Sequence, residues 1–160
     1  MMRGPLFRTA AFKVTLAAVL ALGGGPMTGL MSGPIAASAA PLRHDHPYIG
    51  IWKIMLPDGS CSETYRVRAD GSTLVFSHQE VAESSYVIAD QPDKEGFYKS
   101  VDTIVKDNGK PDCTGQITKP GRSVTNYLLF HPGGNMFLMC VERSMERCIG
   151  PFVRVEGSDI

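Results

Sequence analysis

The chain has 160 residues, with 16 basic and 16 acidic side chains and 43 % apolar residues. This length indicates one domain, with or without a tail. The balanced charge argues against a nucleic-acid-binding protein, which normally carries a basic face, and the apolar content excludes disorder of the whole chain. Four cysteines, 17 glycines and 11 prolines, with no long helical pattern, indicate a small, turn-rich β protein.

The first 39 residues have the features of a cleaved signal peptide. Three basic residues precede an apolar run over residues 14–22, and Ala37-Ser38-Ala39 fits an A-x-A cleavage site. The run is about half of the ~20 residues that a membrane-spanning helix needs. We therefore expect no transmembrane segment in the mature chain and a periplasmic or secreted protein. Loss of the three basic residues would leave a formal net charge of −3.

Short apolar runs separated by turn residues fill the rest of the chain, at spacings typical of β-sandwiches and β-barrels. Asp70-Gly71 and Asn108-Gly109 are strong turn signals. Only residues 79–83 are expected to form a turn of helix. In chain order the sequence predicts strands at residues 49–56, 61–68, 73–78, 85–89, 97–106, 113–117 (short), 124–131, 135–142 and 148–155.

Consecutive strands with tight connections form a meander, and closing the meander removes its exposed edges. We therefore predict an all-β fold, a single antiparallel up-and-down barrel of about eight strands, with a sandwich as the second possibility. The barrel domain is expected over residues 48–157. A flexible N-terminal tail is expected over residues 40–47.

Four cysteines follow the expected cleavage site: Cys61, Cys113, Cys140 and Cys148. An even number in an exported chain favours two disulfides over a metal site, which needs close C-x-x-C pairs. If residues 143–145 form a turn, Cys140 lies opposite Cys148 on a neighbouring strand, close enough for a bridge. Cys61 is then left to pair with Cys113.

The start of the first strand, Gly50-Ile51-Trp52, resembles the Gly-x-Trp signature of the lipocalins, in which the Trp closes one end of the barrel. Thr125-Asn126-Tyr127 is similar to their second motif, Thr-Asp-Tyr, with Asn126 in place of Asp. Arg154 is similar to the arginine that this family lays across the Trp. The resemblance implies an eight-stranded barrel that holds a small ligand, although the mature chain is shorter and shows no C-terminal helix.

The surroundings of three cysteines carry a second resemblance. Asp58-Gly59-x-Cys61, Asp112-Cys113-x-Gly115 and Cys148-x-Gly150-Pro151 resemble a group of small exported bacterial proteins of undefined function. This resemblance spans nearly all of the mature chain and implies no activity.

Aromatic side chains on alternating strands are the candidates for ligand binding, because aromatics inside a barrel either line a cavity or fill it. Together with the arginine in the last strand, the candidate ligand-binding residues are Trp52, Tyr65, Phe76, Tyr86, Phe97, Tyr127, Phe137 and Arg154. His44 and His46 are weak candidates for a metal, since residues i and i+2 of an extended chain share a face. A solvated tail is the favoured interpretation of that segment, and no metal or other cofactor is expected.

The sequence contains no nucleophile motif, zinc-protease motif or phosphate-binding glycine loop, so we do not expect an enzyme. The leading hypothesis is an exported lipocalin-like protein that binds a small, partly apolar molecule in its barrel. The alternative is a periplasmic interaction module or enzyme inhibitor whose partner is a protein. It would act through an exposed loop at residues 91–96 or 108–121. A metal carrier is the third hypothesis.

Overall fold

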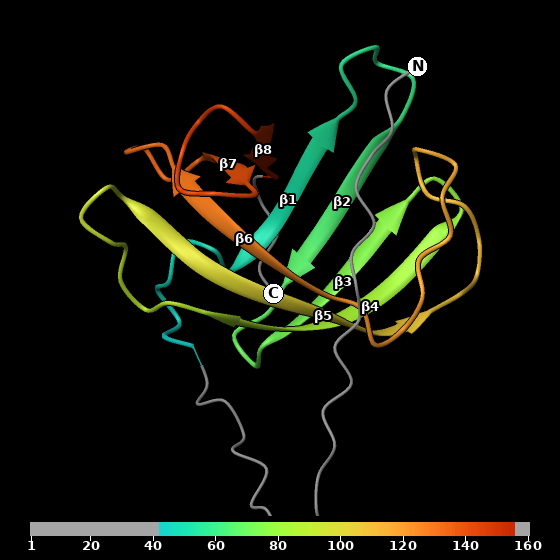
Figure 1. Cartoon of the computed structure of the whole chain (residues 1–160), viewed down its shortest axis with the longest axis horizontal. Coiled ribbons are helices and arrows are strands. Elements are labelled where there is room, and N and C mark those ends of the chain that lie inside the picture. Colours follow the sequence, from blue (N-terminus) through green and yellow to red (C-terminus); the bar gives the residue numbers. More distant parts are fainter. Residues whose placement is uncertain (1–41, 156–160) are drawn as a thin grey trace, which may run out of the picture. The chain divides into compact units, whose positions relative to one another are not determined.

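The computed structural model describes residues 42–155, which form a closed antiparallel β-barrel (Figure 1). Each strand pairs with the next, and the last returns to the first. The predicted up-and-down barrel of eight strands is therefore confirmed, in place of a sandwich. The strands are β1 (Gly50–Met55), β2 (Ser62–Val67), β3 (Ser72–Ser77), β4 (Glu80–Ile88), β5 (Phe97–Asp107), β6 (Ser123–Phe130), β7 (Met136–Cys140) and β8 (Cys148–Arg154).

Two local predictions are wrong. Residues 80–83, expected in a helical turn, begin β4, where burial alternates from Glu80 through Ala82 with the period of two that a strand requires. Residues 113–117, expected as a short strand, form a turn. Asp112 Oδ1 accepts hydrogen bonds from the N–H groups of Thr114 (2.8 Å) and Gln116 (2.9 Å), and this competes with strand pairing.

Both predicted disulfides are confirmed. Cys140 and Cys148 are directly opposed on β7 and β8, so their bridge crosses one pair of strands. The bridge from Cys61 to Cys113 fixes the loop that follows β5 to the start of β2. The same loop supplies Asp112, Thr118 and Arg122 to the lining of a cavity in the barrel.

The barrel closes through a short seam between β1 and β8. Only two residue pairs align there, Trp52 with Arg154 and Lys53 with Val153, whereas six pairs align β1 with β2. The backbone ladder alone therefore joins these strands weakly. Side chains at the same position complete the closure.

The segment before β1 lies against the barrel, where the sequence predicts a flexible tail. The N–H of Leu42 donates to the carbonyl of Ala69 (3.0 Å), and the Leu42 side chain packs on the core. His46 is only 2 % exposed. The backbone hydrogen bond and packed side chain of Leu42, together with the buried His46 ring, hold residues 42–47 in place. The predicted signal peptide and residues 40–41 lie outside the described residues.

Candidate ligand cavity

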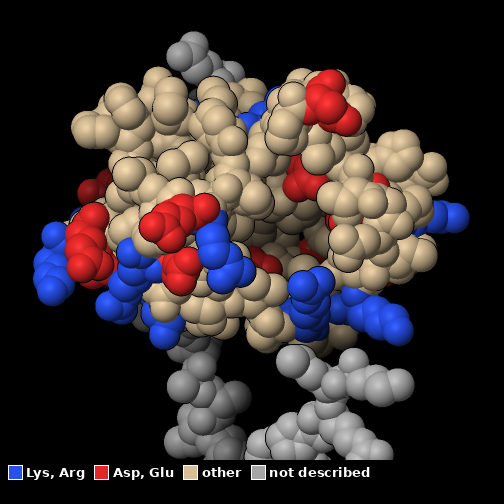
Figure 2. Space-filling view, turned by 45° about the horizontal axis from the view of Figure 1, so that its top comes forward, with Lys and Arg blue, Asp and Glu red and all other residues tan. Residues whose placement is uncertain are grey.

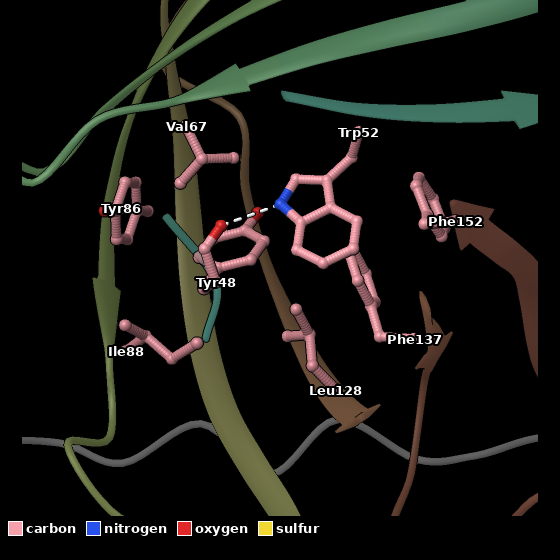
Figure 3. Packing of buried hydrophobic residues seen from close by; sticks show 8 residues of the cluster. All are labelled: Tyr48, Trp52, Val67, Tyr86, Ile88, Leu128, Phe137 and Phe152. Atoms are coloured by element: carbon pink, nitrogen blue, oxygen red, sulfur yellow. Dashed lines mark hydrogen bonds between the residues drawn. The ribbon is translucent and has the colours of Figure 1, made fainter. Parts of the chain in front are cut away.

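One half of the barrel is closed by a cluster of buried aromatic and aliphatic side chains (Figure 3). Trp52 lies at its centre and is fully buried. Its indole N–H donates to the carbonyl of Tyr48 (2.8 Å), and its ring meets the Phe137 ring edge to face, 4.8 Å between centroids. Phe137 in turn stacks on Phe152. This end of the barrel is therefore a filled core with no room for a ligand.

Arg154 covers Trp52 and ties the seam together. Its guanidinium carbon lies 4.2 Å from the Trp52 ring centroid, a cation–π contact. The same guanidinium donates to the carbonyls of Pro47 (2.7 Å), Ile49 (2.9 Å) and Gly134 (3.2 Å). The placement of Arg154 across Trp52, which the lipocalin resemblance implies, is what the structure shows.

The structure explains why a glycine, Gly50, stands at the first position of the Gly-x-Trp sequence. Its φ is +145°, a conformation that favours glycine. A Cβ atom at this position would also collide with Nη1 of Arg154. A glycine therefore leaves the space in which the guanidinium reaches Trp52.

The other half of the barrel contains a cavity of about 370 Å³. Figure 2 looks into a hollow of the surface in which Asp and Glu side chains lie. Tyr48 and Leu128 belong both to the buried core and to the cavity lining, so they form its floor, and Trp52 lies beneath them. Ligand cavities in proteins are about 300–1,000 Å³, so this volume suits a small molecule.

Polar side chains line the cavity on strands β2 to β5. Glu63 accepts hydrogen bonds from the hydroxyls of Tyr65 (2.6 Å) and Ser77 (2.6 Å), and Asp102 accepts one from Ser84 (2.9 Å). Burial raises the pKa of Asp102, and the Ser84 hydroxyl only partly opposes this effect. The polar part of the lining comprises Glu63, Tyr65, Thr73, Glu80, Ser84, Ser100 and Asp102.

Two buried polar atoms of this wall lack a hydrogen-bond partner. Oε1 of Glu80 has none although the residue is 6 % exposed, and Oγ1 of Thr73 has none although the residue is 1 % exposed. Burial is the largest cause that raises the pKa of Glu80, and the neighbouring Asp107 carboxyl adds to it while Thr118 opposes it. Unsatisfied buried groups are uncommon in native proteins and require an explanation.

The facing wall, on strands β6 to β8, is mainly apolar. Its members are Val124 and Leu128 on β6, Met139 on β7 and Ile149 on β8, with Asn126 as the polar exception. The loop after β5 adds Asp112, Thr118 and Arg122 to the lining. The cavity is thus mainly polar and acidic on one side, where Val75, Ala82 and Ile104 are the apolar exceptions, and mainly apolar on the other.

The structure does not gather the predicted ligand-binding residues around this cavity. Tyr65 lines it, whereas Trp52, Tyr86 and Phe137 lie in the core and Arg154 covers Trp52. The remaining three lie elsewhere. Phe76 is on the outer face under Arg66, Tyr127 lies under Arg143, and Phe97 is buried beside the turn at Asp93, to which its N–H donates.

The two candidate metal histidines are also kept apart. His44 is exposed, whereas His46 is buried and uses both ring nitrogens. Its Nδ1 accepts from the N–H of Tyr48 (3.2 Å), which leaves Nε2 to donate to the carbonyl of Ala89 (3.2 Å). Burial lowers the pKa of His46, in keeping with this neutral ring. Among residues 42–155 no group of three or more His, Cys, Asp or Glu side chains could hold a metal ion.

Sequence reasoning missed the acidic residues of the cavity. Residues 79–83 were expected in a helical turn, but Glu80 and Glu83 lie on β4 and point to opposite faces of that strand. The available signal was the alternation along β5, which places Ser100, Asp102 and Ile104 on one face. Polar residues on the inner face of a barrel strand indicate a solvated or ligand-bearing interior.

Comparison with known proteins finds no family model, no curated protein and no solved structure that matches this chain. In the part of the chain that the structure describes, no helix has the length and apolar character needed to span a membrane. The function is therefore inferred from the cavity.

Proposed function

We propose that the protein binds a small, partly apolar molecule inside the open half of its barrel, in the manner of a lipocalin. The observation that carries this proposal is the cavity of about 370 Å³, which is lined mainly by polar side chains on one side and by apolar side chains on the other. A barrel of eight strands has an interior wide enough for side chains alone or for one small ligand. Here the side chains fill one half and leave the other open.

The surroundings of the cavity favour binding to a preformed site. Trp52 and Arg154 fix the floor from below, and the Cys61–Cys113 disulfide holds the loop that supplies Asp112 and Thr118. A site that is already in its bound geometry loses little conformational entropy when the ligand enters. The apolar wall would take the body of the ligand, and the polar wall would take its hydrogen-bonding group.

The test is native mass spectrometry of the protein isolated from its own source. We expect a retained small mass that is released on denaturation. Ala82 lines the cavity and is 3 % exposed, so Ala82→Phe should fill the space and abolish the retained mass. Val81→Phe places the same ring on the neighbouring outward-facing residue and serves as the matched control.

Thermal unfolding of both variants must first show that they fold. A folded Ala82→Phe protein that still carries the same mass would contradict binding in the cavity. The absence of any retained mass from the wild-type protein, together with no response to a diverse small-molecule set, would contradict the binding function itself.

A second function, an interaction module that blocks a protein partner, is favoured by the loop after β5. The disulfide at Cys113 and the turn around Asp112 fix this loop, and Ile117 on it is 59 % exposed. A rigid loop with an exposed apolar side chain loses little entropy on docking. Crosslinking from position 117 in the source organism would capture a protein partner if this second function is the correct one.

We also propose that the protein is exported to the periplasm or secreted, with removal of residues 1–39. Two disulfides support this, because such bonds persist in oxidising compartments. The intact mass of the protein from its source should correspond to a chain that begins at Ala40, and a mass that includes Met1 would refute the proposal.

A further inference from the structure

The charges that line the cavity are strongly unequal. Among the described residues, its lining contains four carboxylates, Glu63, Glu80, Asp102 and Asp112, and a single cation, Arg122. Ion pairs within residues 42–155 join Arg43, Lys106 and Arg143 to other acids, and none of them involves these four carboxylates. The negative charge of the cavity is therefore not neutralised by paired cations of the described chain.

The hydrogen bonds divide these carboxylates into two kinds. Glu63 is bonded to Tyr65 and Ser77, and Asp112 is occupied by its own turn. Asp102 holds a single bond at one oxygen, from Ser84, and Glu80 has an unpartnered oxygen although it is 94 % buried. Both residues line the cavity, and each keeps acceptor capacity that the hydrogen bonds of the described chain leave unused.

We propose that the ligand is a small organic monocation, such as a protonated amine, whose charged group is received by Asp102 and Glu80 and whose apolar body lies against Val124, Met139 and Ile149. This inference rests on the proposed binding function and names the ligand class. A buried carboxylate is stabilised by an opposite charge and by donors to its free oxygens. An ammonium group carries one positive charge and three donors, so it supplies both.

Other ligand classes fit the lining less well. An anion would meet four carboxylates and one arginine. A multivalent metal ion requires several ligating side chains around one point, and residues 42–155 offer no such group. A neutral polar molecule could donate hydrogen bonds, but it would not balance the excess of acidic over basic side chains in the lining. An amine with an apolar body satisfies both walls.

Isothermal titration calorimetry on the whole mature protein tests the ligand class with three probes of the same shape. The probes are 2-phenylethylamine, 2-phenylethanol and 3-phenylpropionate, which carry charges of about +1, 0 and −1 at neutral pH. We expect the amine to bind at least about tenfold more tightly than the alcohol, and the carboxylate not to bind, since tenfold corresponds to about 1.4 kcal/mol.

Two cavity variants locate the charge. Asp102→Asn and Glu80→Gln should each weaken amine binding at least about fivefold and change alcohol binding less than about twofold, because they keep shape and remove charge. The matched control is Glu83→Gln, which removes a carboxylate paired with Lys106 on the outer face of the same strand. It should leave both affinities unchanged.

Thermal unfolding separates lost binding from lost folding. Each cavity variant should be at least as stable as the wild type, since the carboxylate that it removes has no ion-pair partner among the described residues. Equal affinities for amine and alcohol, or amine binding that survives in both variants, would overturn the cation assignment and leave the binding function in place. Failure of all three probes to bind at millimolar concentration would also overturn it, and the retained-mass measurement would still decide the binding function independently.

Discussion

Replacement of Arg154 by methionine tests the closed end of the barrel most directly. The substitution keeps an unbranched side chain of similar reach over Trp52, so packing on the ring is largely preserved. It removes the charge and three hydrogen bonds, to the carbonyls of Pro47, Ile49 and Gly134. These carbonyls belong to the segment before β1 and to the turn before β7, so the change loosens the contacts of β8 with two other parts of the chain at once.

The expected loss follows from the contacts. Each hydrogen bond to a charged group contributes about 1.5–3 kcal/mol, and the cation–π contact with Trp52 contributes about 1–2 kcal/mol. Such contributions are not additive, and the guanidinium is only partly buried, so water can reach some of the freed carbonyls. We therefore expect Arg154→Met to lower the free energy of unfolding by about 3–5 kcal/mol.

Urea unfolding followed by Trp52 emission measures this loss in the whole mature protein. The matched control is Arg66→Met, because Arg66 also stacks on an aromatic ring, that of Phe76, at 5.3 Å, but on the exposed outer face. That variant should lose less than about 1 kcal/mol. A loss below about 1 kcal/mol for Arg154→Met, with unchanged native Trp52 emission, would refute the role assigned to the guanidinium.

Three further predictions concern the core, the disulfide and one buried carboxyl. Trp52→Ala, which removes the one tryptophan, should cost about 3–5 kcal/mol in urea unfolding followed by circular dichroism. Native wild-type emission should be blue-shifted because the ring is fully buried, and red emission before denaturant would contradict this. Cys61→Ser with Cys113→Ser should cost about 4 kcal/mol in the same assay, given a sequence separation of 52, and a loss near zero would argue against the loop-closure reasoning. Folding raises the pKa of Asp102 above its unfolded value. The ionised carboxylate therefore lowers the free energy of unfolding at neutral pH, and this loss disappears as the pH falls below the unfolded pKa. Asp102→Asn should therefore stabilise the free protein more at pH 7 than at pH 4, and a pH-independent effect would contradict the cause given for the shift.

The fold could be predicted because its signals are local and repeated. Glycine turns separate runs of strand length, and the distance from Cys140 to Cys148 allows the two residues to face each other across a hairpin. Each signal acts over a few residues, so no long-range information was needed to obtain a meander. Its closure followed from the cost of leaving edges exposed.

The cavity could not be predicted in the same way because it depends on which inward-facing residues fail to fill the space. Aromatic residues were expected to line it, but their large apolar surfaces pack best against one another, as Trp52, Phe137 and Phe152 do at the closed end. Smaller and polar side chains, such as Ser84 and Asp102, line the open half instead. Whether a strand residue points inward is local, but its depth in the barrel depends on the stagger of all eight strands.

The two halves of the barrel have opposite effects on stability, and this difference supports a binding role for the open one. The closed half buries large rings, satisfies the indole N–H of Trp52 and covers the ring with Arg154. The open half contains Glu80 and Thr73 with unpartnered polar atoms, an arrangement that destabilises a protein in the absence of a ligand. Apolar side chains at these positions would give a more stable barrel of the same topology. A bound molecule that pairs with these atoms would remove their cost. Saturating 2-phenylethylamine should therefore raise the melting temperature of Glu80→Gln less than that of Glu83→Gln. Equal increases would show that the Glu80 carboxyl takes no part in ligand binding.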